Sequence, residues 1–224
     1  MNKLLTVTKY SLALLATSMA TGLFAQSLQV TVADSEGNPL GESVIEVLLP
    51  AEMQTQYQTL EAKQVDQQDK EFVPGVTIVT RGSRVSFPNS DDILHHVYSF
   101  SSAKTFNIPL YGRGENDDYF ETFTSTGVVE IGCNIHDWML AYIYVAESRL
   151  AVLTNEAGTA LLDSLPTGEF QVRVWHPRVS GDMEELLHSV RLDPDATTTL
   201  QVELELQRDR RVRRAPGSSG RRYR

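Results

Sequence analysis

The sequence predicts an all-β protein built from packed β-sandwich layers, and three observations support that prediction. Its 224 residues are 41% hydrophobic and 22% charged, with 14 Gly and 9 Pro, which is the composition of a folded protein with a core. Short apolar–polar alternations recur along the chain between turns rich in Gly, Pro, Asn and Asp. Long runs with the helical period are scarce, so an all-helical protein is not expected.

The first and last parts of the chain predict strands outside the central region. Residues 27–39 alternate and lead into a turn, and a second strand follows, so we expect a β-hairpin within residues 26–50. Residues 148–206 predict a further β-sandwich module, with strands at 151–162, 165–175 and 200–206. The hairpin belongs either to this module or to the sheet of the central unit.

Two other segments predict less regular structure. Residues 51–69 are rich in Gln and Glu and are expected to form a linker or a short surface helix. Residues 112–118 are expected to form a polar loop.

Charge is distributed unevenly along the chain. Residues 26–206 hold 10 basic and 28 acidic residues, a formal charge of −18, whereas residues 207–224 hold 8 Arg and one Asp, a charge of +7. An acidic body repels phosphates, so nucleic-acid binding is not expected. The tail, 207–224, is expected to be disordered. It either contacts anionic surfaces, or it serves as a solubilising end or associates with the acidic body, and we favour the latter two.

The N-terminal segment predicts export. Residues 1–25 place Lys3 and Lys9 before a short apolar stretch, which is typical of a signal peptide cleaved after Ala25. That stretch is too short to cross a bilayer, and no later segment is long and apolar enough. We therefore expect a periplasmic protein without a membrane span.

Cys133 is the only cysteine of the chain. In an oxidising compartment, a single cysteine is a buried thiol, an intermolecular crosslink, a nucleophile or a metal ligand. Residues on both sides of it alternate with the period of a strand, so a short loop carrying His136 and Met139 joins two strands. Each residue alone is more often part of a core, but their combination favours a metal site.

The donor types favour copper. Thiolate and imidazole with a weak thioether form the trigonal arrangement of electron-transfer copper sites, whereas zinc has no use for a thioether. The second imidazole would come from His95 or His96, which follow a predicted strand–turn–strand over residues 76–89. Adjacent side chains of a strand point to opposite faces, so only one of them can reach the metal. His176 and His188 have no donors at ligand spacing and are expected to be structural or surface residues.

The central motifs resemble the hallmarks of the cupredoxin family. They are Phe72-x-Pro74, Gly82-x-x-Val85-x-Phe87-Pro88-Asn89, His95-x-Val97 and the Cys133-x₂-His136-x₂-Met139 loop, all within residues 70–147. The loop spacing is similar to that of amicyanin. Further motifs extend the resemblance to a group of periplasmic cupredoxin-like methylamine utilisation proteins: Lys104-x-Phe106, Leu110-Tyr111 and Cys133-Asn-Ile-His136.

The resemblance implies a Greek-key β-sandwich with one mononuclear type 1 (blue) copper. Its ligands would be His95, Cys133 and His136 in a plane, with Met139 weakly axial. In the family an Asn that ties the ligand loops commonly follows the first ligand His; here His96 stands in its place and remains a fallback ligand. The flanking strands resemble a carboxypeptidase regulatory-like or transthyretin-like module into which residues 70–147 are inserted.

The function expected from these features is one-electron transport between unidentified redox partner proteins. Two alternatives stay open: copper binding or delivery without redox cycling, and an extracellular β-sandwich binding module with a degenerate metal site. An enzyme is not expected, since the sequence has no nucleophile elbow, Walker loop, zinc-protease motif or dinucleotide-binding motif. A Cys133 nucleophile paired with His136 would leave Met139 and the upstream histidines unexplained.

Overall fold

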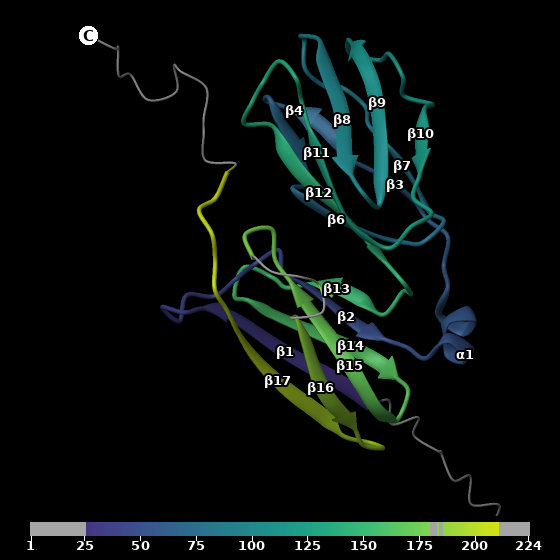
Figure 1. Cartoon of the computed structure of the whole chain (residues 1–224), viewed down its shortest axis with the longest axis vertical. Helices are drawn as coiled ribbons and strands as arrows, with labels where there is room; N and C mark the ends of the chain where they lie inside the picture. The colour runs from purple at the N-terminus through teal and green to yellow at the C-terminus, as the bar shows by residue number, and fades with distance from the viewer. Residues whose placement is uncertain (1–25, 180–182, 184–185, 211–224) are drawn as a thin grey trace, which may run out of the picture.

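The computed structural model describes residues 26–179, 183 and 186–210, so the expected signal peptide and residues 211–224 of the tail lie outside the described part. The described chain is β-structured apart from helix α1 (Ala51–Gln54) and the 3₁₀ turn η1 (Thr55–Tyr57). Two stacked bodies are visible in Figure 1: an upper unit made of β3–β12 and a lower unit made of β1, β2 and β13–β17. The all-β prediction is confirmed.

The lower unit is a sandwich of a three-stranded and a four-stranded sheet. The strand orders are β14-β1-β17, with β1 and β17 parallel, and β13-β2-β15-β16. Apolar side chains from both sheets, between Leu28 and Leu204, fill one core. The strands are β1 (Gln26–Asp34), β2 (Val44–Leu48), β13 (Ala151–Leu153), β14 (Thr159–Leu165), β15 (Gly168–Trp175), β16 (Leu187–Leu192) and β17 (Thr197–Leu204).

The expected hairpin within residues 26–50 is wrong in its pairing, although both of its strands exist. The turn lies where expected. It is stabilised by the Asp34 carboxylate, which accepts hydrogen bonds from the backbone amides of Glu36 and Asn38. After it, β2 joins the opposite sheet and pairs with β13 and β15, while β1 pairs with β14 and β17. Local alternation defines the faces of a strand but not its partner, so this crossover was not predictable from the segment.

The upper unit contains a five-stranded sheet in the order β6-β12-β11-β8-β9, a three-stranded sheet β10-β7-β3 and the pair β4-β5. Its core holds apolar side chains between Val65 and Val145, including Cys133 and Met139. The strands are β3 (Ala62–Gln64), β4 (Asp66–Gln68), β5 (Glu71–Val73), β6 (Val76–Thr80), β7 (Arg84–Ser86), β8 (His95–Ser101), β9 (Lys104–Tyr111), β10 (Phe120–Thr122), β11 (Gly127–Gly132) and β12 (Leu140–Ala146).

The segment 51–69 combines the expected short helix with strands that the composition did not predict. Helix α1 occupies its start, but β3 pairs in parallel with β7, and β4 pairs with β5. Residues 62–69 are therefore part of the upper unit. β3 is exposed throughout, so its polar side chains Lys63 and Gln64 face water, whereas Gln67 of β4 is fully buried.

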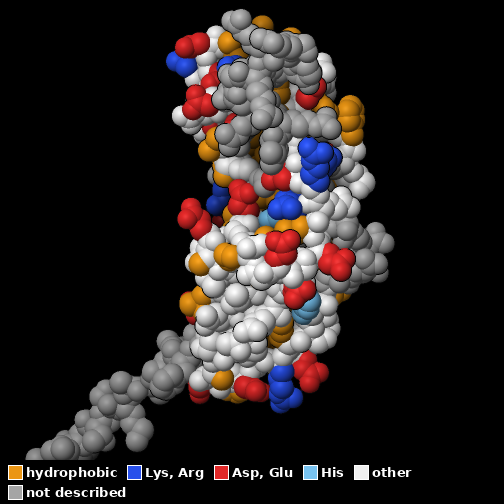
Figure 2. Space-filling view, turned by 90° about the vertical axis from the view of Figure 1, so that its left-hand side faces the viewer, with side chains coloured by type: hydrophobic (Ala, Val, Ile, Leu, Met, Phe, Trp, Pro, Cys, Tyr) orange, Lys and Arg blue, Asp and Glu red, His pale blue; other side chains and the backbone are white. Residues whose placement is uncertain are grey.

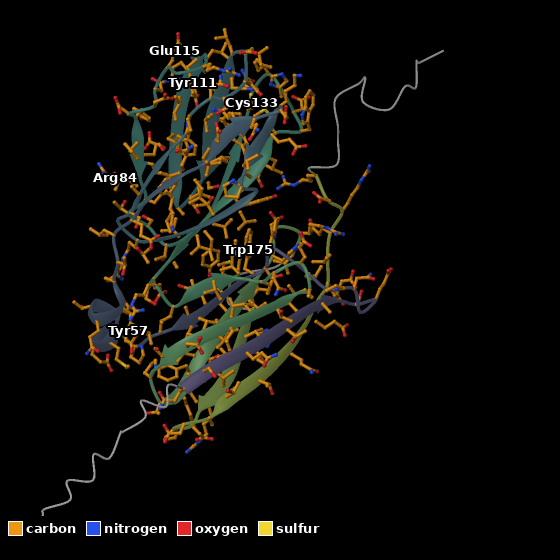
Figure 3. All side chains as sticks on the ribbon, turned by 180° about the vertical axis from the view of Figure 1, so that it is seen from behind. Tyr57, Arg84, Tyr111, Glu115, Cys133 and Trp175 are labelled. Carbon is orange, nitrogen blue, oxygen red and sulfur yellow. The ribbon has the colours of Figure 1, made fainter. Side chains whose placement is uncertain are left out.

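β12 joins the two units because both of its faces are covered. Ala141, Ile143 and Val145 point into the upper core, while Tyr142 and Tyr144 belong to a separate cluster with Trp175 of β15. The Trp175 ring lies 5.5 Å from the Tyr142 ring and 5.8 Å from the Tyr144 ring. Figure 3 shows Trp175 at the junction of the units and Cys133 higher in the upper unit.

The exterior of the described chain carries charges of both signs. Acidic side chains occur along the whole face drawn in Figure 2, with basic side chains between them. Within the described residues, no helix has the length and apolar character needed to cross a membrane.

Candidate metal centre

Three of the predicted donors converge in the upper unit. His95 begins β8, Cys133 follows the last residue of β11, and His136 lies in the loop before β12. The Cys133 Sγ atom lies 3.9 Å from Nδ1 of His95 and 3.8 Å from Nδ1 of His136. One donor atom from each residue lies within 4.8 Å of those of the other two. Residues that are far apart in the sequence thus form one cluster.

The fully buried His95 ring is held in one orientation by Asp91. Its Nε2 lies 2.7 Å from the Asp91 carboxylate, which also accepts the backbone amides of Asp69 at 2.7 Å and Lys70 at 2.9 Å. Partial burial acts to raise the pKa of Asp91, but hydrogen bonds from His95 and these two amides lower it overall. A carboxylate here makes Nε2 the donor of that hydrogen bond, which leaves the lone pair of Nδ1 facing Cys133.

Asp91 was not foreseen as part of the site, and neither was the role of Asn89. The buried Asn89 side chain donates to the backbone carbonyls of Ile93 and Tyr111, at 2.8 and 3.0 Å, and accepts the amide of Asp91. It therefore fixes the turn that carries Asp91. The sequence feature that could have indicated this turn is the Phe-Pro-Asn run ending at Asn89, which is separated from His95 by a short segment.

His96 lies on the opposite face of β8 from His95. Its ring packs 5.4 Å from the ring of Tyr98, and it is not part of the converging group. This is the arrangement expected for adjacent strand residues, of which only one faces the core.

The loop from Cys133 to Met139 is closed by backbone hydrogen bonds. The Cys133 amide donates to the Met139 carbonyl at 3.3 Å, and the Met139 amide donates to the His136 carbonyl at 3.0 Å. Both sulfur-bearing side chains are almost fully buried in the upper core, with 3% exposure for Cys133 and 2% for Met139. The loop thus returns Met139 to the same core that contains the thiol.

His136 is the partly exposed member of the cluster. Its ring lies 5.0 Å from the ring of His95 and 5.2 Å from that of Trp138. Partial burial lowers the pKa of His136, and the nearby His95 and Lys70 lower it further, which favours the neutral ring that a metal requires. Trp138 packs against the core and donates from its indole to the Lys70 carbonyl at 3.1 Å.

The two remaining histidines take no part in the site. The buried His176 accepts the backbone amide of Arg178 at its Nδ1 atom, and His188 lies on β16, where burial lowers its pKa. Both belong to the lower unit.

The donors that are present suit copper. A thiolate and two imidazoles, with a thioether buried in the same core, form the soft and borderline set that copper accepts in electron-transfer sites. A zinc site would use the thiolate and imidazoles and leave Met139 without a role.

Comparison with known proteins gives structural neighbours only. No family model matches the chain, and no curated protein matches it. Similar solved structures include a purple cupredoxin from Nitrosopumilus maritimus, with 21% identity over 38% of this chain and 99% of that chain and a TM-score of 0.33. The reduced form of an amicyanin mutant is 21% identical over 37% of this chain and 79% of its own, with a TM-score of 0.34.

A third neighbour is a copper-containing nitrite reductase from Thermus scotoductus. It is 25% identical over 45% of this chain, with a TM-score of 0.35, and the match spans 25% of that chain. The neighbours are thus cupredoxins and a copper enzyme, and cupredoxins are the family that the sequence motifs resemble.

Proposed function

We propose that this protein is a type 1 copper protein that carries single electrons between redox partners in the periplasm. His95, Cys133 and His136 would bind one copper, with Met139 as a fourth, weaker ligand. The observation that carries the proposal is the convergence of one thiol and two imidazoles at the edge of a buried core. Bound copper would supply the one-electron redox couple.

The protein's contribution is to hold the donors in place. Asp91 fixes the ring of His95, and two backbone hydrogen bonds fix the Cys133–Met139 loop. Donors that are held by the fold move little when the charge at the site changes, which keeps the cost of reorganisation low. The rigidity of these residues therefore favours electron carriage over a site that opens to release its metal.

The exposed edge of His136 is the proposed route for the electron. It is the partly exposed donor of the three, and its neighbour Ile135 is 47% exposed. An apolar surface beside a donor suits brief contact with a partner protein, because little polar surface has to be desolvated. The partners would be redox proteins, and we propose no catalysis by the chain itself.

The test is voltammetry of the copper-loaded protein, with His136→Ala and His96→Gln as a matched pair. A reversible one-electron wave in the wild type and in His96→Gln, lost in His136→Ala, supports the proposal. Tight copper binding without a reversible wave would indicate a copper-delivery protein. Failure to bind copper tightly would indicate a β-sandwich binding module with a degenerate site.

A further inference from the structure

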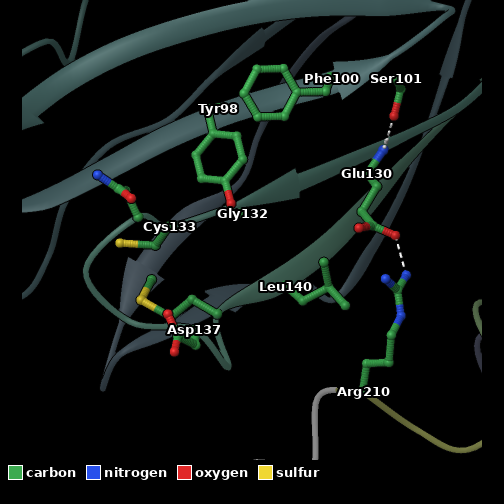
Figure 4. Close-up of a pocket in the computed structure, with 11 residues that line it drawn as sticks. Tyr98, Phe100, Ser101, Glu130, Gly132, Cys133, Asp137, Leu140 and Arg210 are labelled. Carbon is green, nitrogen blue, oxygen red and sulfur yellow. Dashed lines mark hydrogen bonds and ion pairs between the residues drawn. The ribbon is translucent and has the colours of Figure 1, made fainter.

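A groove lies on the outer face of the five-stranded sheet, next to the candidate metal centre. Its volume is about 590 Å³. It lies over β8, β11 and the start of β12, and it extends to the ligand loop, where Cys133 and Met139 are among its lining residues. Figure 4 shows its walls, formed by Tyr98 and Phe100 on one side and by Glu130, Leu140 and Arg210 on the other. Next to the groove, the lower unit packs against Tyr142 and Tyr144 of β12 and covers that part of the sheet face. The groove itself stays open.

One wall of the groove is an exposed aromatic surface. The rings of Tyr98 and Phe100 lie 5.2 Å apart, and Phe100 is 83% exposed. Gly132 leaves room beneath Tyr98, because a Cβ atom at this position would lie 3.2 Å from the Tyr98 hydroxyl. Two acidic residues, Glu130 and Asp137, also line the groove. Aromatic faces next to carboxylates are suited to binding guanidinium groups, which stack and form ion pairs.

One arginine of this chain already binds at the edge of the groove. Arg210 donates to the Glu130 carboxylate (Figure 4) and, at 3.3 Å, to the Tyr142 hydroxyl. The chain reaches this point from the lower unit, where the amide of Gln207 donates to the carbonyl of Arg178 at 2.7 Å. The segment after β17 therefore leaves its own unit and contacts the strand that leads to Cys133.

We propose that the groove binds the arginine-rich segment 211–224 of the same chain, mainly through Arg211, Arg213 and Arg214. These residues follow Arg210 directly, and an extended chain advances about 3.3 Å per residue, so all three are within reach of the groove. Their charge complements Glu130 and Asp137, and their guanidinium planes match the rings of Tyr98 and Phe100. The proposed contact between these arginines and the groove would join the basic tail to the acidic body at one defined place.

The consequence is an internal competitor on one face of the site. The outer surface of β11, behind Cys133, would be covered by the tail, while the edge at His136 would stay open. A cationic partner would have to displace the tail before it could bind this face. The proposal concerns the polypeptide alone and holds whether or not copper is bound.

The test compares amide NMR spectra of the metal-free chain in three forms. These are the wild type, a proximal variant (Arg211→Gln, Arg213→Gln, Arg214→Gln) and a distal control (Arg221→Gln, Arg222→Gln, Arg224→Gln). We expect the amides of Tyr98, Phe100, Glu130 and Gly132 to shift in the proximal variant and to remain near their wild-type positions in the control. High salt should reproduce the shifts in the wild type, because it screens the ion pairs.

Phe100→Ser provides an independent check from the groove side, and the exposure of Phe100 makes this a surface change. In this variant the amides of residues 211–214 should shift. Groove amides that are identical in the wild type and the proximal variant would overturn the proposal. Groove shifts that depend on protein concentration would also overturn it, because they would identify a second copy of the chain as the occupant.

Discussion

At the scale of single residues, the three converging donors are held to different degrees. His95 is fully buried and bonded to Asp91, Cys133 is buried in the core, and His136 reaches the surface. Asp91 connects the His95 ring to the backbone, because its carboxylate accepts hydrogen bonds from two backbone amides as well as from the imidazole. The residue that orients the first histidine is therefore itself fixed by the fold.

Asp91→Asn should weaken Cu(II) binding by about 10- to 100-fold, the range found when a group that orients a ligand is lost. An amide cannot supply the negative charge that keeps the Nε2 proton of His95 in place. Asp92→Asn is the matched control, because the Asp92 side chain is 87% exposed and pairs with Arg113. Competition titration with a copper chelator measures both affinities, and equal affinities in the two variants would exclude this role for Asp91.

At the scale of elements, the ligand loop could be predicted from the sequence. The contacts that hold His95 in place through Asp91 could not. Alternation on either side of Cys133 and the spacing to Met139 define two strands and a short loop, which correspond to β11 and β12. Asp91 was missed because its role depends on amides of Asp69 and Lys70, which approach it only in the folded chain. Likewise, nothing within residues 26–50 indicates that β2 leaves the sheet of β1.

Met139→Leu should preserve the fold and the thiolate–copper absorption but raise the reduction potential. Leu is close to Met in volume, so the expected loss of stability is less than about 1.5 kcal/mol. Removing a weak axial donor destabilises Cu(II) more than Cu(I), because the more highly charged ion gains more from the donor. Voltammetry measures the change, and an unchanged potential would show that Met139 is a core residue and not a ligand.

At the scale of the whole molecule, the two units share a polar contact that closes their junction. The buried Glu46 carboxylate accepts hydrogen bonds from the Tyr144 hydroxyl at 2.6 Å, the Arg173 guanidinium at 3.0 Å and the Glu147 amide at 2.7 Å. Tyr144 belongs to the upper unit, and Glu46 and Arg173 belong to the lower unit. The role of Glu46 cannot be predicted from the sequence, because Tyr144 and Arg173 lie 98 and 127 positions away along the chain.

Arg173→Met should lower the free energy of unfolding by about 3 kcal/mol, since it leaves the buried Glu46 without its cation. Arg191→Met is the control, and its loss should be below about 1 kcal/mol because the Arg191 side chain is 70% exposed. Urea unfolding of the metal-free protein measures both. Equal losses would mean that the junction does not depend on this ion pair.

The most direct test of the central claim is a titration of the chain with Cu(II), followed by visible absorption, for the wild type and Cys133→Ser. A thiolate bound to Cu(II) gives an intense visible band, and the hydroxyl that replaces it does not. We expect a band that saturates at one copper per chain in the wild type and is lost in the Ser variant. A wild type without the band, or a band that persists in Cys133→Ser, would contradict this expectation.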